Sequence, residues 1–197
     1  MNGPADLARR VAAGEAVLFP TDTLPALACR PEAAALLWRL KQRPADKPLI
    51  LMGADLPQLI AVLAVPWQQA WLEQARCSWP GAVTLVLPVT GTLTDHLHPG
   101  GTSLGLRVPA CEPARELLRL TGPLATTSAN RSGQPPATTA AEAALQFPGL
   151  ALLEPQPWPP GSGQASTVLA WRGEERSDDP WAVLRAGVLP APGAGGA

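Results

Sequence analysis

The chain has 197 residues, of which 46% are hydrophobic and 16% are charged, and its formal net charge is −1. This length and composition predict one globular domain with a sizeable core and exclude a disordered chain. No apolar run approaches the length of a membrane span, no secretory pattern opens the sequence, and three widely spaced cysteines do not suggest a disulfide framework. We therefore expect a soluble cytoplasmic protein with no membrane partner, whose charge gives no general attraction to nucleic acid.

Apolar runs and helical spacing alternate along the chain. The N-terminal half predicts a helix that starts at Pro4 and stops before Gly14, a strand over 16–19, a helix over 32–40, a strand over 49–52, and helices over 56–63 and 67–75. The C-terminal half predicts strands over 82–87, 104–108, 124–127, 166–171 and 181–184, with helices over 112–120 and 139–145. This order indicates a single α/β domain over residues 1–189, with an open mixed sheet flanked by helices, and a flexible Pro/Gly/Ala tail over 190–197.

Three cations lie close together directly before the apolar strand over 49–52. Lys41, Arg43 and Lys47 would stand at the mouth of a buried strand, in a loop stiffened by prolines. Arginine offers an anion a planar fork and lysine a point charge, so the cluster predicts a site for a small anionic ligand. The alternative is that these cations only end an amphipathic helix, where the helix dipole favours them.

Three further polar clusters lie at the ends of predicted strands. They are residues 21–23, residues 126–133 and the pair Ser166-Thr167, while Arg107 and Arg185 add single cations on short strands. Ligands of open α/β sheets gather at strand ends, and hydroxyls beside arginines suit phosphate or carboxylate binding. Each cluster alone is better explained by hydroxyls that satisfy their own backbone, but four clusters in one small domain favour a shared pocket.

Other catalytic and metal motifs are weak or missing in the sequence. Asp95, His96 and His98 could hold a metal if their segment were extended, since alternate residues of a strand face one way. No further ligand of matching character follows nearby, so an ordinary polar loop is the simpler interpretation, and we predict no metal site. The sequence contains no Walker A motif and no dinucleotide-binding glycine motif, and its two histidines lie too close together to suggest a Ser/His/Asp triad.

Six short motifs follow one another along the chain. They are Pro20-Thr21-Asp22-Thr23, Lys41-Gln42-Arg43-Pro44 with Pro48-Leu49, Trp79-Pro80-Gly81, Leu106-Arg107-Val108-Pro109, Ser128-Ala129-Asn130-Arg131-Ser132-Gly133 and Ser166-Thr167-Val168. Each motif is weak alone. Together, and in this order, they resemble the YrdC family of threonylcarbamoyl-adenylate synthases over nearly the whole chain, from about Gly14 to about Gly187.

The resemblance implies a twisted mixed α/β sheet with a concave, positively charged pocket. It also implies the family's reaction, in which L-threonine, bicarbonate and ATP give threonylcarbamoyl-AMP and pyrophosphate. That reaction is the first step of N6-threonylcarbamoyladenosine synthesis at adenosine 37 of tRNA. A downstream threonylcarbamoyl transferase is therefore an expected partner, and tRNA or another RNA is a further candidate. Mg²⁺ is expected to travel with ATP rather than in a protein cage.

By family position, two groups of residues are candidates for the site. The residues implied to bind ATP are Lys41, Arg43, Lys47, Ser103, Ser128, Asn130 and Arg185. The residues implied to bind threonine are Thr23, Arg107, Thr126 and Ser166. Lys41 and Arg43 are also the catalytic candidates, because positioning and charge neutralisation dominate an attack on a phosphate.

The sequence departs from the family pattern at three places. Residues 24–27 read Leu-Pro-Ala-Leu where the family usually has V-Y-G-L, Lys47 stands where many members have Asn, and Met52 stands where many have His. These changes bear on amino-acid preference and rate more than on adenylation. Two alternatives remain: an RNA-binding module of the same fold without adenylation activity, and a carbamoyl-transfer module such as those of larger maturases.

Overall fold

A computed structural model describes residues 2–45, 47–173 and 179–188, and the predicted tail over 190–197 lies outside this part of the chain. The strands are β1 (Val17–Phe19), β2 (Ala26–Cys29), β3 (Ile50–Met52), β4 (Val83–Leu87), β5 (Leu104–Arg107), β6 (Leu124–Ser128), β7 (Ala151–Leu152), β8 (Thr167–Trp171) and β9 (Trp181–Arg185). The helices are α1 (Pro4–Ala12), the 3-10 helix η1 (Pro31–Ala33), α2 (Ala35–Lys41), α3 (Leu56–Leu63), α4 (Gln69–Ser78), α5 (Thr92–Leu97), α6 (Glu112–Thr121) and α7 (Ala140–Gln146).

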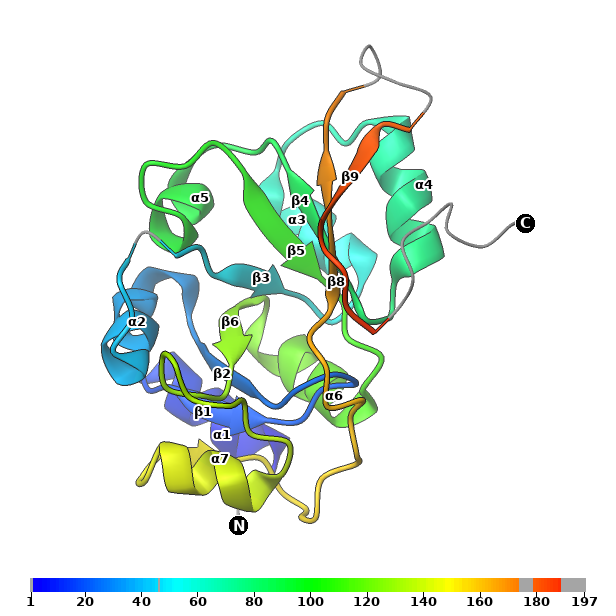
Figure 1. Cartoon of the computed structure of the whole chain (residues 1–197). Coiled ribbons are helices and arrows are strands. Elements are labelled where there is room, and N and C mark those ends of the chain that lie inside the picture. The colour runs from blue at the N-terminus through cyan, green and yellow to red at the C-terminus, as the bar shows by residue number, and fades with distance from the viewer. Residues whose placement is uncertain (1, 46, 174–178, 189–197) are drawn as a thin grey trace, which may run out of the picture.

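The strands of the described residues form one nine-stranded sheet in the order β7-β1-β2-β6-β3-β5-β4-β8-β9 (Figure 1). Neighbouring strands run parallel in the pairs β1–β7, β3–β5 and β4–β8. The other neighbouring pairs are antiparallel. The prediction of an α/β protein with one mixed sheet and flanking helices is therefore confirmed.

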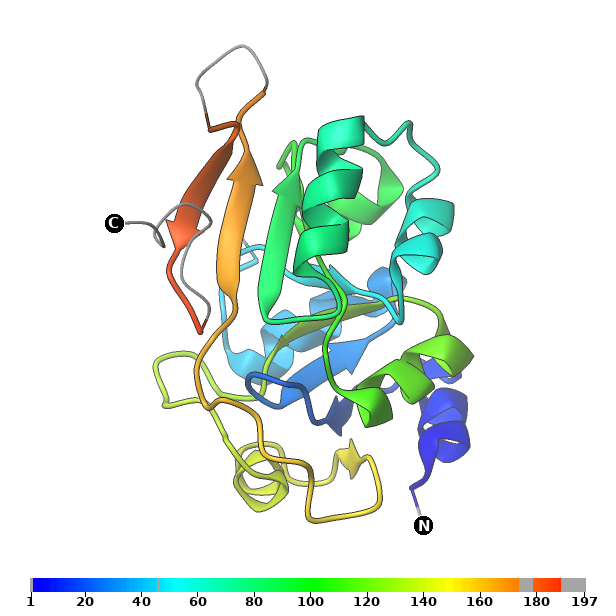
Figure 2. The same ribbon diagram turned by 90° about the vertical axis from the view of Figure 1, so that its right-hand side faces the viewer.

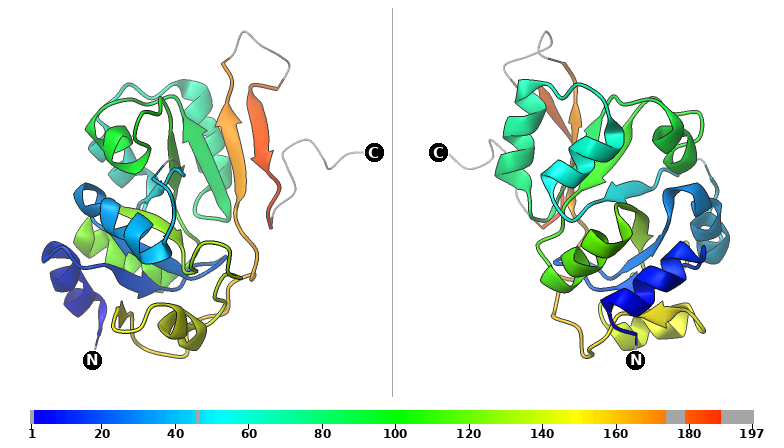
Figure 3. Two further views of the ribbon diagram at one scale, coloured as in Figure 1. Left: turned by 60° about the vertical axis from the view of Figure 1, so that its left-hand side comes forward. Right: turned by 180° about the vertical axis from the view of Figure 1, so that it is seen from behind.

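The two faces of the sheet carry different cores, and β3 shows the alternation of its side chains between them. Leu51 belongs to the larger core, which packs the sheet against α2, α3 and α4. Met52 belongs to the smaller core, which packs against α1 and α6, and Ile50 packs beside it. Figure 2 shows α4 against β4 and β8, and the right-hand view of Figure 3 shows α1 beside α6. The smaller core leaves part of its face uncovered, and the site described below lies there.

The ends of two helices follow their local sequence. Thr139 caps α7 by accepting a hydrogen bond from the backbone N–H of Glu142, as the Thr-x-x-Glu pattern predicts. At the end of α2, Gln42 takes a left-handed conformation with φ of 52°, and the N–H of Arg43 donates to the carbonyl oxygen of Trp38 at 3.0 Å. This helix end fixes the backbone that carries the predicted anion-binding cations.

The candidate metal segment is helical rather than extended. Asp95 and His96 lie on α5, where the sequence favoured a polar loop. Leu93 and Leu97 are four positions apart, so a helix brings both to the larger core, and their burial outweighs the polar composition of the segment. Among the described residues, no three His, Cys, Asp or Glu side chains gather as possible metal ligands.

The sequence does not predict β2 or β7. β2 reads Ala-Leu-Ala-Cys and has no β-branched residue, yet all four residues are buried and the strand pairs with both β1 and β6. β7 has two residues, too few for a recognisable pattern. Among the described helices, none combines the length and apolar character that crossing a membrane requires.

Candidate active site

A pocket of about 200 Å³ opens on the face of the sheet that carries Ile50 and Met52, and we call it the sheet pocket. Its polar lining includes the predicted residues Thr23, Arg43, Arg107, Thr126, Ser128, Ser166 and Arg185. Its apolar lining consists of Leu24, Pro25, Ala26, Pro48, Ile50, Met52 and Ala165. An apolar surface with a few cations and hydroxyls suits a small polar ligand that carries an anionic group.

A second pocket, of about 250 Å³, lies between the end of α2 and the loop that follows β6, and we call it the loop pocket. It is lined by Lys41, Arg43, Pro44, Lys47, Ser128, Asn130, Ser132 and Gly133. Arg43 and Ser128 line both pockets, so the two adjoin and form one site with two parts. Together the pockets contain every predicted site residue except Ser103.

Ser103 lines neither pocket. It directly precedes β5, and its carbonyl oxygen lies 2.9 Å from Nδ1 of His98. It is in the same alternating row of the strand as Arg107, which does line the sheet pocket. A contact between Ser103 and the nucleotide stays a prediction.

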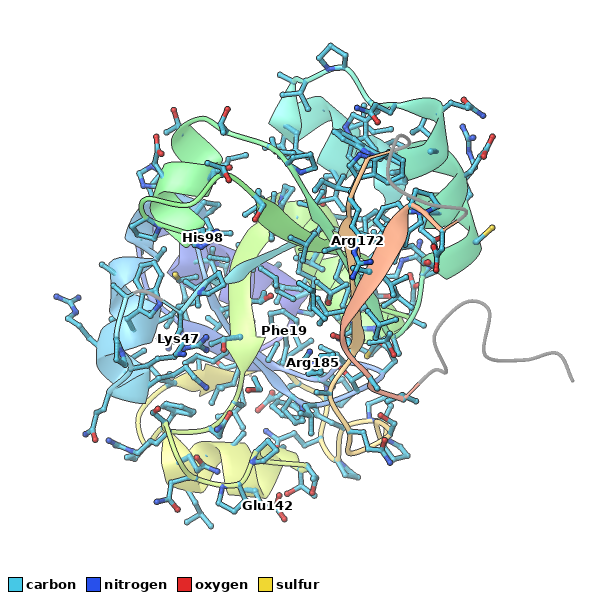
Figure 4. The ribbon with its side chains drawn as sticks, turned by 45° about the horizontal axis from the view of Figure 1, so that its top comes forward. Phe19, Lys47, His98, Glu142, Arg172 and Arg185 are labelled. Atoms are coloured by element: carbon cyan, nitrogen blue, oxygen red, sulfur yellow. The ribbon has the colours of Figure 1, made fainter. Side chains whose placement is uncertain are left out.

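The charge of this site is strongly one-sided. Among the described residues that line the two pockets there is no Asp or Glu, while the cations are Lys41, Arg43, Lys47, Arg107 and Arg185. Figure 4 shows Lys47 and Arg185 on either side of β6. Their residue numbers show that these cations come from distant parts of the chain. Cations concentrated in a cleft attract and retain anionic ligands, even though the whole chain is close to neutral.

Lys41 ties α2 to the loop after β6. Its side chain is only 2% exposed, and Nζ donates to the carbonyl oxygen of Ser128 at 2.6 Å, to the carbonyl oxygen of Asn130 and to Asn130 Oδ1 at 3.1 Å. All three acceptors are uncharged. Burial, with a smaller contribution from the charge of Arg43, therefore lowers the pKa of Lys41 from 10.5 to about 8. All three N–H groups of Nζ are used in these contacts, so a phosphate that supplies a negative charge must replace one of them.

The lowered pKa of Lys41 predicts an alkaline limit to nucleotide use. We expect kcat/KM for ATP to fall as the pH rises through about 8, because this parameter reports the ionisation of the free enzyme. Lys41→Arg should remove this limb, since arginine keeps its proton throughout the range. A pH profile of both proteins checks this, and an unchanged alkaline limb in Lys41→Arg would assign the limb to another group.

The same ionisation affects stability with a defined sign. The pKa of Lys41 is lower in the folded protein than the usual value of 10.5, so the unfolded chain holds more protons between about pH 8 and 10.5. The contribution of Lys41 to stability therefore increases as the pH rises through that interval. Below about pH 8, the buried ammonium group costs stability.

Arg43 stands at the border of the two pockets. It lies two positions after the last residue of α2, and its side chain is half-buried. Its Nη1 lies 3.4 Å from Thr127 Oγ1, and its Nη2 lies 3.4 Å from the carbonyl oxygen of Pro48. Both distances are long for hydrogen bonds.

Arg107 lies at the end of β5 and is 3% exposed. Its Nη2 forms an ion pair with Asp22 Oδ1 at 2.7 Å, its Nη1 donates to Thr23 Oγ1 at 2.8 Å, and its Nε donates to the carbonyl oxygen of Gly81 at 3.1 Å. Burial lowers the pKa of Arg107, and the charge of Asp22 opposes that shift. The guanidinium is therefore fixed in direction while it lines the sheet pocket.

Arg185 and Ser166 bring the C-terminal strands to the pocket. Nε and Nη2 of Arg185 donate to the carbonyl oxygen of Ser166 at 3.1 and 2.9 Å, and Nη2 lies 3.2 Å from Ser166 Oγ. Ser166 Oγ also lies 2.9 Å from Thr84 Oγ1, which anchors it to β4. Partial burial lowers the pKa of Arg185. Figure 4 shows Arg185 at the end of β9, close to β8.

Two residues of the motifs take part in this site although the sequence assigned them no role. Asp22 pairs with Arg107, and Gly81 supplies a carbonyl acceptor to it. Their place in the motifs is the signal that could have identified them. Asp22 is an acid inside a hydroxyl-rich turn, and Gly81 is a glycine shortly before a strand. Their long-range partner could not be inferred from spacing.

The fold and the motifs can be compared with known protein families. The model of the Sua5/YciO/YrdC family, described as "Telomere recombination", matches residues 9–187. The chain belongs to this family. The resemblance inferred from the sequence motifs is thus confirmed.

Relatives within the family carry a specific name. The chain is 43% identical over 139 residues to the threonylcarbamoyl-AMP synthase of Idiomarina loihiensis, which covers 66% of this chain and 73% of that protein. It is 41% identical over 147 residues to the threonylcarbamoyl-AMP synthase of Sodalis glossinidius, which covers 71% of this chain and 75% of that protein. It is also similar to the structure of P. abyssi Sua5 complexed with L-threonine, with a TM-score of 0.84 and 33% identity. That match covers 95% of this chain and 54% of the Sua5 chain, so this chain spans about half the length of Sua5.

Proposed function

We propose that this protein is a threonylcarbamoyl-AMP synthase, which makes threonylcarbamoyl-AMP and pyrophosphate from L-threonine, bicarbonate and ATP. The observation that carries the proposal is the two-part cationic site, whose sheet and loop pockets meet at Arg43 and Ser128. A reaction that joins an amino-acid derivative to a nucleotide needs two adjoining pockets of this kind. Relatives at 41–43% identity bear the name of this activity.

The two pockets divide most of the substrate contacts in the proposed reaction, although Arg185, which the resemblance assigns to ATP, lines the sheet pocket. Threonine lies in the sheet pocket, with its carboxylate at Arg107 and its polar groups near Thr23, Thr126 and Ser166. ATP brings its phosphates to the loop pocket, where Lys41 and the residues of the β6 loop receive them. The α-phosphate then lies at the border, near Arg43.

The chemistry follows from this placement. The threonine amine combines with bicarbonate, with loss of water, to give a carbamate. A carbamate oxygen attacks the α-phosphorus of ATP, the bond from that phosphorus to the β-phosphate bridging oxygen breaks, and pyrophosphate leaves with the electron pair. Negative charge accumulates on the phosphate oxygens, so fixed cations such as Lys41 and Arg43 lower the barrier. Mg²⁺ enters with ATP as part of the substrate.

The proposal extends to the place of the reaction in the cell. The product is a mixed anhydride that a transferase must consume, and we propose that this transferase modifies adenosine in tRNA. The adenylation needs ATP and free threonine, and the transfer needs the product of the adenylation. We therefore propose that the protein works in the cytoplasm. Direct binding of tRNA by this chain is not needed for the adenylation itself.

One assay tests the proposed function. The full chain is incubated with ATP, Mg²⁺, bicarbonate and L-threonine, while pyrophosphate is measured and the adenylate is identified by mass spectrometry. We expect both products, and we expect neither when threonine or bicarbonate is omitted. No product under any condition would overturn the proposal. Salt-sensitive binding of RNA without pyrophosphate release would favour the RNA-binding module of the same fold.

Pro25 predicts a relaxed choice of amino acid. It is buried and lines the sheet pocket where the family usually has tyrosine, so the pocket lacks one hydroxyl. Discrimination of threonine from serine depends on one methyl group, worth about 1–3 kcal/mol in a pocket. We expect Pro25→Tyr to increase the ratio of kcat/KM for threonine over serine and to leave the KM for ATP unchanged. An unchanged ratio would place Pro25 outside the wall that selects the amino acid.

A further inference from the structure

Arg107 has a defined number of donors left for a ligand. A guanidinium carries five N–H groups, one on Nε and two on each terminal nitrogen. Three of them donate to Gly81, Thr23 and Asp22, so two remain, one on Nη1 and one on Nη2. A carboxylate can accept from both terminal nitrogens at once, provided that the guanidinium plane is held in one orientation.

Asp22 contacts Arg107 from outside the pocket. Its Oδ1 accepts from Arg107 Nη2 at 2.7 Å and from the backbone N–H of Ala110 at 3.0 Å. The acid thereby joins the turn between β1 and β2 to the loop after β5, and it does not itself line either pocket. Its carbonyl oxygen also accepts from the N–H of Ser162 at 3.0 Å, which fixes its backbone.

Gly81 holds the opposite side of the guanidinium. Its carbonyl oxygen accepts from Arg107 Nε, and its own N–H donates to the carbonyl oxygen of Val108 at 2.9 Å. A Cβ at this position would lie 2.5 Å from the carbonyl oxygen of Ser78, so only glycine fits. Arg107 is therefore clamped between a charged partner and a backbone partner that come from different loops.

We propose that Asp22 is a positioning residue for the carboxylate of the amino-acid substrate, acting through Arg107. This inference rests on the proposed function, because it assigns the substrate carboxylate to the sheet pocket. Asp22 compensates the buried charge of Arg107 and keeps its two remaining N–H groups available to the pocket. Without the acid, Arg107 would be a buried cation with hydroxyl and carbonyl partners only, and with Arg185 repelling it. Its guanidinium would then reorient.

Threonine binding to the full chain tests this role. Asp22→Asn keeps the size of the side chain and removes its charge, and we expect it to weaken L-threonine binding by roughly 10- to 100-fold, as displaced positioning groups do. The KM for ATP and the kcat at saturating threonine should change little. Glu15→Gln is the matched control, because it removes one acid from the exposed Arg10–Glu15 ion pair at the other end of β1.

A double-mutant cycle separates positioning from general stability. If Asp22 acts through Arg107, then Asp22→Asn should add nothing to the loss of threonine affinity already caused by Arg107→Lys. If Asp22 only stabilises the fold, the two losses should add. Asp22→Glu keeps the charge but moves the carboxylate, and it serves as the second variant if Asp22→Asn unfolds. It should also weaken threonine binding.

The possible outcomes distinguish this inference from the proposed function. Wild-type threonine affinity in both Asp22→Asn and Asp22→Glu would overturn the inference, and so would additive losses in the cycle. Failure of the wild-type chain to bind threonine would overturn it as well. Threonine binding without release of pyrophosphate from ATP would overturn the proposed function only, because the affinity comparison would still decide the role of Asp22.

Discussion

Lys41→Ala and Arg43→Ala are each expected to slow threonylcarbamoyl-AMP formation, because each variant loses about 2–4 kcal/mol of transition-state stabilisation. Lys41 is buried beside uncharged oxygens and Arg43 stands where the two pockets meet, so each would face a phosphate that gains charge during the reaction. Arg43→Ala should act mainly on kcat. Lys41→Ala should in addition raise the KM for ATP, because its Nζ also holds the loop at Ser128 and Asn130. Steady-state kinetics with varied ATP measure both effects.

Arg39→Ala is the matched control for these two variants. Arg39 lies on the same helix and is exposed, and it lines neither pocket. Its loss should leave both kcat and the KM for ATP near the wild-type values. Wild-type turnover in Lys41→Ala and Arg43→Ala at sub-saturating ATP would remove these residues from the site.

Gly161→Ala is expected to damage stability and threonine use together. A Cβ at this position would lie 2.3 Å from the carbonyl oxygen of Thr23 and 2.8 Å from that of Thr21, and a backbone atom cannot move aside as a flexible side chain can. The loop also holds this turn through the N–H of Gly163, which donates to Thr23 at 3.1 Å. Forced separation should cost about 1–3 kcal/mol of unfolding free energy and raise the KM for threonine.

Ser162→Ala is the control for Gly161→Ala. It changes the neighbouring residue but adds no atom near the turn, and the hydroxyl that it removes makes two 3.3 Å contacts with the backbone of Gln164, one to its carbonyl oxygen and one from its N–H. Thermal unfolding and threonine kinetics of both variants are compared. Equal stability and equal threonine KM in Gly161→Ala and Ser162→Ala would show that the loop does not support the threonine pocket.

Local patterns predicted much of this fold because they depend on neighbouring residues. The apolar run over 49–52 gave a buried strand, and the capping pattern at Thr139 gave the start of α7. β2 was not predictable, since its four buried residues have little strand propensity and depend on pairing with β1 and β6. α5 was missed because its polar residues conceal two leucines that reach the core.

The membership of the site could be inferred from the motifs, but its internal contacts could not. Arg107 and Asp22 are 85 positions apart, and Lys41 reaches carbonyl oxygens 87 and 89 positions away. Periodicity and composition carry no information about such pairings, which arise only when the strands assemble. Arg107 is an example. The motifs predict that it contacts threonine, but only the structure shows that Asp22 also holds its side chain.

The position of Arg185 has a consequence for how the protein is made. The sheet pocket takes residues from the turn after β1, near the start of the chain, and its last cation from the end of β9. A chain still held by the ribosome before residue 185 can pair β1, β2, β3 and β6, but it lacks this wall of the pocket. The pocket therefore gains this cation only when β9 has been made, so we expect chains truncated before residue 185 to consume ATP poorly.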